Sequence, residues 1–239
     1  MPFTPVTLLI ATRNAHKVAE IRGLLGERFP CLTLKDFPDA PAVIEDAPTF
    51  AGNATKKAAD LAGWLAVGIS NFKFQISNST LVLADDSGLE VDALNGAPGV
   101  HSARFAALDR SADSVSANSP DADNNAKLLR LLKAVPVEKR SARFRCVLAI
   151  TPILPSRTEN ASPVCLASEF EMMTQTFDGT CEGRIGFSPR GRNGFGYDPL
   201  FVPEGFEQTF AELGDAAKNQ LSHRAKALTK LKLYLSARR

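Results

Sequence analysis

Short hydrophobic runs recur along the chain, and polar turns separate them. An apolar run at residues 6–11 predicts a buried strand, and apolar residues then recur at helical spacing over residues 18–25. The polar residues 12–17 lie between these two segments. The pattern therefore predicts a strand, a tight polar turn and a helix at the start of the chain.

The same pattern predicts further elements of both kinds. Thr49 can cap an alanine-rich helix over residues 50–67, and Ser222 can cap a last helix whose leucines continue at helical spacing. Apolar residues predict strands near 32–34, over 142–151 and over 166–177. Because strands and helices alternate in the first and last thirds, the predicted fold class is α/β.

Two adjacent carboxylates lie in the stretch from Thr80 to Arg104. Asp85 and Asp86 follow the apolar residues 81–84 and precede Ser87 and Gly88, so we expect a buried strand to end there and the chain to turn. Ligands of open α/β sheets gather at the carboxyl ends of strands. Successive side chains point to opposite faces, so one carboxylate would face a site and the other would brace the turn. Solvated turn residues are the alternative interpretation.

The polar turn at residues 12–17 would meet a helix N-terminus, which is a suitable anion site. Lys17 in the first helical turn opposes the helix dipole unless an anion is bound there, although it could equally point to water. Glu45 and Asp46 lead into the helix that bears Lys57. This arrangement could hold a metal and a phosphate, or it could be a solvated loop and helix face.

A second candidate region lies near the C-terminus of the sequence. Phe195 and Tyr197 are interspersed with glycines at residues 191–201, so they could stack on a nucleobase or belong to a core. Lys218, His223 and Arg224 would cluster near the start of the last helix, where polar ligand atoms could bind. A single histidine in such a place is more often a capping or core residue than a catalyst.

Composition narrows the function classes. The chain has 239 residues and a net charge of +2, which is too small for a nucleic-acid-binding footprint. The four cysteines form no C-x-x-C pair, so we expect reduced thiols and a cytoplasmic location. The apolar run at residues 6–11 is too short to span a membrane and has no basic segment before it, so we expect neither a membrane anchor nor a signal peptide.

Seven short motifs follow one another along the chain. They are Thr12-x-Asn14-x-x-Lys17, Thr49-Phe50-x-x-Asn53-Ala54, Ala84-Asp85-Asp86-Ser87-Gly88-Leu89, Gly96-Ala97-Pro98-Gly99-Val100, Ser102-Ala103-Arg104, Gly194-Phe195-Gly196-Tyr197-Asp198-Pro199 and Ser222-His223-Arg224. Any one of them is weak evidence, but the ordered set is specific. Together they give the chain a resemblance to the Ham1/inosine triphosphate pyrophosphatase family over about residues 8–233.

The resemblance implies a Mg²⁺-dependent enzyme that acts as a homodimer. Such enzymes cleave ITP, dITP and XTP to the monophosphate and pyrophosphate. It also implies a single domain over residues 1–239: an elongated mixed sheet with flanking helices, arranged as two lobes with a central cleft.

The resemblance also implies a role for each candidate residue. Asp86 would be the general base, and Glu45 and Asp86 would hold the metal. Phe195 would stack on the base, and Lys218, His223 and Arg224 would read the 6-oxo edge of the purine. The remaining substrate contacts would come from Thr12, Arg13, Asn14, Ala15, His16, Lys17, Lys57, Ser87, Gly196, Tyr197 and Asp198.

The chain departs from the family pattern in one motif and in two insertions. Gly52 stands where the family usually has Glu, so Glu45 or Asp46 would have to compensate at a metal site. The segments 68–79 and 152–163 are longer than expected and could alter a dimer surface. Two other hypotheses remain: a purine-nucleotide-binding module without catalysis, and a nucleic-acid-binding protein that uses the basic last helix.

Overall fold

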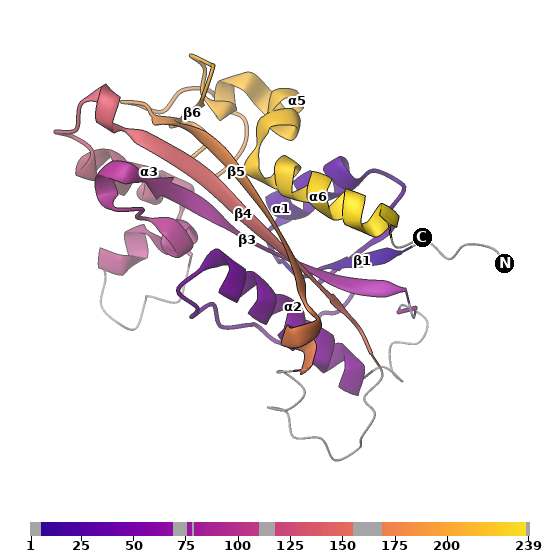
Figure 1. Ribbon diagram of the computed structural model, residues 1–239. Coiled ribbons are helices and arrows are strands. Elements are labelled where there is room, and N and C mark those ends of the chain that lie inside the picture. The colour runs from indigo at the N-terminus through magenta and orange to yellow at the C-terminus, as the bar shows by residue number, and fades with distance from the viewer. Residues whose placement is uncertain (1–5, 69–75, 78, 110–117, 155–168, 238–239) are drawn as a thin grey trace. The chain divides into compact units, whose positions relative to one another are not determined.

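The computed structural model describes residues 6–68, 76, 77, 79–109, 118–154 and 169–237. Within them the strands form one mixed sheet in the order β2-β1-β3-β4-β5-β6 (Figure 1). The strands are β1 (Thr7–Ile10), β2 (Cys31–Thr33), β3 (Thr80–Val91), β4 (Ser141–Pro152), β5 (Gln175–Ile185) and β6 (Phe201–Pro203). The longer helices are α1 (Ala15–Leu25), α2 (Phe50–Val67), α3 (Asp121–Leu131), α5 (Phe210–Leu221) and α6 (His223–Ala237). The predicted α/β class and mixed sheet are confirmed.

The chain divides into two compact units. The first consists of Met1–Asp86, Val147–Phe177 and Leu228–Arg239, and the second of Ser87–Cys146 and Asp178–Ala227. Strands β3, β4 and β5 and helix α6 each contribute residues to both units.

In the first unit, the order of the strands reverses at β1. This strand pairs in parallel with β2 on one side and with β3 on the other, with Ile10 opposite Thr33 and Leu83. Parallel crossovers are right-handed, so the connection from β1 to β2 and the oppositely directed connection from β2 to β3 place their helices on opposite faces. Accordingly α1 lies on one face of this part of the sheet and α2 on the other (Figure 1). The carboxyl end of β1, next to Leu83 of β3, thus lies at a topological switch point, the usual ligand position in open α/β sheets.

Helix α2 forms from local signals that the sequence displays. Thr49 has extended backbone angles, and its hydroxyl accepts a hydrogen bond from the Gly52 amide at 3.0 Å. Ala54, Ala58 and Ala62 are fully buried on one side of the helix. Small side chains at this spacing let the helix approach the sheet closely. Helix α2 is therefore a rigid support for the polar side chains that it carries.

The second unit packs an aromatic core around β4, β6 and α5. The ring centroids of Phe144 and Phe201 lie 4.7 Å apart, and Phe210 packs against both. Gly179 of β5 faces the start of α6, where a Cβ atom would lie 2.0 Å from the His223 carbonyl oxygen. The strand therefore needs glycine there because the helix backbone approaches it so closely.

Two predicted boundaries were wrong. Strand β3 does not end at Asp85 but continues to Val91, since Leu89 and Val91 extend its apolar pattern and are fully buried. Within the predicted strand 166–177, residues 169–173 are helical, and β5 begins only at Gln175. Most of the two predicted insertions, 68–79 and 152–163, lies outside the described residues.

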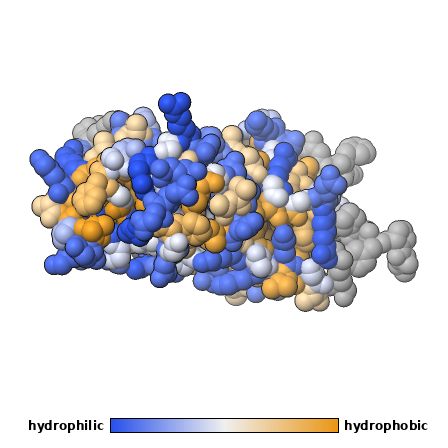
Figure 2. Space-filling view, turned by 90° about the horizontal axis from the view of Figure 1, so that it is seen from above, coloured by the Kyte–Doolittle hydropathy of each residue, from blue (hydrophilic) through white to orange (hydrophobic). Residues whose placement is uncertain are grey.

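The described surface mixes polar and apolar residues. On the face drawn in Figure 2, hydrophobic residues are interspersed with hydrophilic ones. Among the helices in the described part of the chain, none combines the length and apolar character needed to cross a bilayer.

Candidate functional site

The polar turn after β1 is organised by Asn14. Its side-chain oxygen caps α1 by accepting hydrogen bonds from the amides of His16 at 2.9 Å and Lys17 at 3.1 Å. The Thr12 hydroxyl accepts a third bond from the Asn14 amide at 3.2 Å. Arg13 instead reaches the Ala40 carbonyl, at 2.8 Å. The turn is thus preformed, and a phosphate would have to share these amides with the Asn14 cap.

Lys17 forms an ion pair with Asp85, whose side chain is fully buried. The sequence predicts that Lys17, in the first turn of α1, faces either water or a bound anion, and neither is needed. The protein itself supplies the anion, so Asp85 braces α1 against β3. This pairing gives Asp85 the bracing role that the alternation of side chains predicted for one of the two carboxylates.

Lys57 of α2 is the centre of the charged cluster in this unit. Its ammonium nitrogen lies 2.9 Å from Asp86 Oδ1, 3.2 Å from Glu45 Oε1 and 2.8 Å from the Asp85 carbonyl oxygen. Lys57 and Asp86 are both buried. The structure therefore brings together the three predicted residues Glu45, Lys57 and Asp86 around one nitrogen atom.

Asn53 completes this cluster and was absent from the predicted site. Its side-chain nitrogen donates to Asp86 Oδ2 at 3.3 Å, and its oxygen accepts from the Ala47 amide at 2.9 Å. It is fully buried, one turn before Lys57 on the same face of α2. The available signal was its place in the motif Thr49-Phe50-x-x-Asn53-Ala54, four residues before Lys57.

The cluster carries an excess negative charge. The carboxylates of Glu45, Asp85 and Asp86 face the ammonium groups of Lys17 and Lys57, which leaves one negative charge in excess. Burial raises the pKa of Asp86, although both lysines oppose this rise. Burial acts to lower the pKa of Lys57, but the charges of Asp86 and Glu45 outweigh it and raise the pKa. Both groups therefore hold their protons more tightly than usual, Asp86 because it is buried and Lys57 because carboxylates surround it.

The donor set of this cluster fits Mg²⁺. Two carboxylates, Glu45 and Asp86, lie within reach of a single cationic nitrogen, so a small cation could replace or adjoin that nitrogen. The described residues contain no group of three or more histidine, cysteine or acidic side chains placed to hold a metal ion. Mg²⁺ is commonly bound by one or two carboxylates, with waters and substrate phosphates as the other ligands.

Gly52 allows the acidic loop to lie directly on α2. A Cβ atom at this position would approach the Ala47 Cβ to 2.7 Å and the Thr49 hydroxyl to 3.1 Å. The next residue, Asn53, fixes Ala47 through the hydrogen bond described above. A glutamate at position 52 would displace this loop. The position of Glu45 therefore depends on the absence of a side chain at position 52.

The second unit holds a separate cluster around Phe195. The Lys218 ammonium group lies over the Phe195 ring, 4.5 Å from its centroid, and forms a buried ion pair with Asp198 at 2.6 Å. The same Asp198 oxygen accepts from the Phe195 amide at 2.9 Å. Asp198 therefore fixes both the aromatic residue and the cation next to it.

Arg224 extends this cluster. Its guanidinium group lies 6.0 Å from the Phe195 centroid and donates to the Ser87 hydroxyl at 2.9 Å. The His223 ring stacks on Phe144 of the core, with 4.8 Å between centroids and 12° between planes. The structure thus groups Ser87, Phe195 and Arg224 with Asp198 and Lys218, and it buries the His223 ring against the core.

Tyr197 is buried in the core of the second unit. Its hydroxyl donates to the Ser102 carbonyl oxygen at 2.9 Å, and burial raises its pKa far above the ordinary range. The side chain therefore anchors the glycine-rich loop, and of the two candidate stacking residues only Phe195 is partly exposed.

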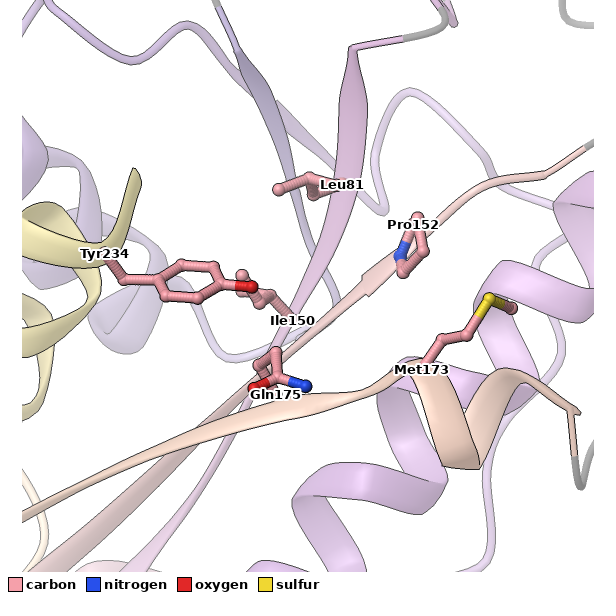
Figure 3. A pocket seen from close by; sticks show the side chains of 6 residues that line it. All are labelled: Leu81, Ile150, Pro152, Met173, Gln175 and Tyr234. Atoms are coloured by element: carbon pink, nitrogen blue, oxygen red, sulfur yellow. The ribbon is translucent and has the colours of Figure 1, made fainter. Parts of the chain in front are cut away.

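An apolar cavity of about 290 Å³ lies elsewhere in the first unit (Figure 3). Its lining side chains come from β3, β4, β5, α6 and the short helical segment before β5, and none is charged. They are Leu81, Ile150, Pro152, Met173, Gln175 and Tyr234. A polyphosphate would find no cation there, so the charged cluster is the better candidate site.

The fold and the charged cluster define an α/β protein with a lysine–carboxylate site at the switch point of its sheet, a position suited to phosphate-bearing ligands. Comparison with known proteins gives the family. Residues 8–234 match the Ham1 family. The chain therefore belongs to the Ham1 family.

Individual relatives agree over nearly the whole chain. The dITP/XTP pyrophosphatase of Geobacillus kaustophilus (strain HTA426) is 45% identical over 94% of this chain and 91% of its own length. That of Shouchella clausii (strain KSM-K16) is 42% identical over 94% of both chains. Among solved structures, a HAM1 protein from Coxiella burnetii is 33% identical with a TM-score of 0.71, covering 97% of this chain and 99% of that one.

Proposed function

We propose that this protein hydrolyses the non-canonical purine nucleoside triphosphates ITP, dITP and XTP to the monophosphate and pyrophosphate. The observation that carries the proposal is the group formed by the buried Lys57 and Asp86 with the partly exposed Glu45, next to the Lys17 turn. It combines cations for a polyphosphate with carboxylates for a metal and for a proton. The relatives named dITP/XTP pyrophosphatases support the choice of substrate.

The triphosphate is assigned to the first unit. A triphosphate carries close to four negative charges, which Lys17 and Lys57 would partly neutralise. The turn at residues 12–16 would contribute Thr12, Asn14 and the amides at the start of α1, a common position for phosphates. Arg13, Ala15 and His16 are exposed in the same turn.

We propose Mg²⁺ as the cofactor, with Glu45 and Asp86 as its protein ligands. When bound, the ion would neutralise phosphate charge and bridge substrate to protein. Asp86 would act as general base: it takes a proton from a water molecule whose oxygen bonds to phosphorus. The P–O bond that links the α- and β-phosphates breaks, and pyrophosphate leaves. Burial, which raises the pKa of Asp86, makes it a better proton acceptor than an exposed aspartate.

The base is assigned to the second unit, where Phe195 would stack on the purine and Ser87 would contact the substrate. Lys218, Arg224 and the backbone near His223 would offer donors to the 6-oxo group. Adenine has an amino group at this position, so those donors would be left unpaired. A buried unpaired donor costs about 1–3 kcal/mol, so two of them give roughly a hundredfold discrimination or more.

Three further features belong to the proposal. The two units would work as one functional domain, the enzyme would be a homodimer, and it would reside in the cytoplasm, where its nucleotide substrates occur. The family resemblance motivates all three.

A pyrophosphate-release screen tests the function. ITP, dITP and XTP are compared with ATP and GTP, with and without Mg²⁺. We expect pyrophosphate from the first three, much slower release from ATP and GTP, and no release without the metal. Orthophosphate as the first product would refute the proposal. Tight ITP binding without turnover at any Mg²⁺ concentration would instead favour a nucleotide-binding module without catalysis. Gly52, which stands where the family usually has Glu, is the reason to test this alternative.

A further inference from the structure

We infer that Asp121 and Asn125 of α3 are positioning residues that hold Phe195 in place for the purine base. This inference rests on the proposed function. Asp121 Oδ2 accepts a hydrogen bond from the Gly196 amide at 2.6 Å, and Asn125 Nδ2 donates to the Gly196 carbonyl oxygen at 3.0 Å. One helix therefore holds both backbone polar groups of the residue that follows Phe195.

The loop needs such an external constraint because of its glycines. Gly194 and Gly196 flank Phe195, and both have positive φ angles, of 77° and 64°. Glycine reaches these angles easily but also leaves them easily, so the backbone on either side of Phe195 is intrinsically permissive. Hydrogen bonds must therefore select one conformation.

Two carboxylates select this conformation by accepting hydrogen bonds from consecutive backbone amides. Asp198 accepts from the Phe195 amide at 2.9 Å, and Asp121 accepts from the Gly196 amide. Asp198 belongs to the loop itself, whereas Asp121 and Asn125 belong to α3, more than 70 residues earlier in the chain. Asp121 and Asn125 are four residues apart, so they project from one face of the helix.

Helix α3 is itself fixed by its other side chains. Asn124 accepts from the Ala106 amide at 2.8 Å and donates to the Ala103 carbonyl at 3.3 Å. The Lys127 ammonium group donates to the Phe105 carbonyl at 2.7 Å and lies over the Phe105 ring, 4.4 Å from its centroid. The helix is thus a rigid support, which is what a residue that positions a stacking ring requires.

The test compares the Asp121→Ala/Asn125→Ala double variant with Asp123→Ala. Asp123 lies in the same first turn of α3 and carries the same charge, so its removal reproduces the effect on the helix dipole. We expect KM for ITP to rise about tenfold in the double variant with kcat nearly unchanged, because two hydrogen bonds that preorganise binding are lost. The single variant Asp121→Asn keeps an acceptor oxygen, so it should retain most of the wild-type affinity for ITP.

Amide hydrogen exchange provides a readout that does not depend on the substrate. Exchange in the peptide covering residues 193–198 should rise in the double variant and stay near the wild-type rate in Asp123→Ala. ITP turnover with an unchanged KM in the double variant would overturn the inference, even if exchange rises. If wild-type protein releases no pyrophosphate from ITP, the proposed function fails, and the base-positioning role fails with it.

Discussion

At the scale of single residues, the site depends on which carboxylate takes which role. Asp85 and Asp86 are adjacent and both buried, yet Asp85 pairs with Lys17 whereas Asp86 meets Lys57 and Asn53. Asp86 also lies next to Glu45 through the shared Lys57 contact. This division gives Asp85 a bracing contact with α1 and leaves Asp86 for the proposed chemical role.

Replacing Asp86 with asparagine should abolish turnover while the protein stays folded. The amide has nearly the same shape but cannot take a proton from water, and a general base contributes about 10²–10⁴-fold to a rate. Steady-state pyrophosphate release measures the loss. Asp46→Asn makes the same chemical change on an exposed carboxylate and should remain active. If Asp86→Asn keeps a tenth of the wild-type activity, Asp86 is not the general base.

The pH dependence of the reaction should report the environment of Asp86. Its raised pKa means that the folded protein binds this proton more tightly than an ordinary aspartate, so the ionised form, which the base requires, is reached only at higher pH. We expect the acid limb of kcat/KM to lie above the ordinary value of 3.8. Lys57→Gln should move it higher still, because the Lys57 charge lowers the Asp86 pKa. A limb at or below 3.8, with the fold intact by circular dichroism, would contradict this.

Adding one methyl group at Gly52 should destabilise the protein through contact with Ala47. The added Cβ would lie 2.7 Å from the Ala47 Cβ, and overpacking of this kind costs about 1–3 kcal/mol. In an Ala47→Gly background the main clash is absent, so Gly52→Ala should cost much less there. Urea unfolding of the four proteins gives the interaction free energy. Equal costs in both backgrounds would show that the loop does not pack on α2 in this way.

At the scale of elements, the Lys17–Asp85 pair ties α1 to β3. Lys17→Met should weaken triphosphate binding and also lower the free energy of unfolding by about 3–5 kcal/mol, because it removes the cation that faces a buried carboxylate. Lys17→Met/Asp85→Asn should recover much of the stability but not the binding. The two effects are separated by denaturant unfolding and by the KM for ITP. Recovery of both together would mean that Lys17 serves binding only through the fold.

Helix α2 is the element that the sequence predicted best. Thr49, the alanines and the absence of interior proline lie within one segment, and the observed bounds, Phe50–Val67, are the predicted ones. Strand β3 was predicted less well because Asp85, Asp86, Ser87 and Gly88 resemble a turn. In the structure the charges of this segment are compensated by α1 and α2, so the extended backbone continues through it.

At the scale of the whole molecule, the homodimer proposal can be tested independently of the pyrophosphatase proposal. The chain has a mass of 25.7 kDa, so the proposed dimer would scatter light as a particle of twice that mass. Size-exclusion chromatography with light scattering measures this directly, and a dilution series shows whether the species dissociates. A mass of one chain at all concentrations would reject the dimer and leave the pyrophosphatase proposal unaffected.

The sequence by itself determined the α/β class, helix α2 with its Thr49 cap, and the candidates Glu45, Lys57, Asp86 and Phe195. These depend on periodicity and on motifs, which are properties of neighbouring residues. Only the tertiary structure decided which lysine meets which carboxylate, and that Asn53, Asp121 and Asn125 contact the candidate residues. Such pairings join segments far apart in the chain. Their energies depend on burial and distance, which exist only after the strands and helices have packed.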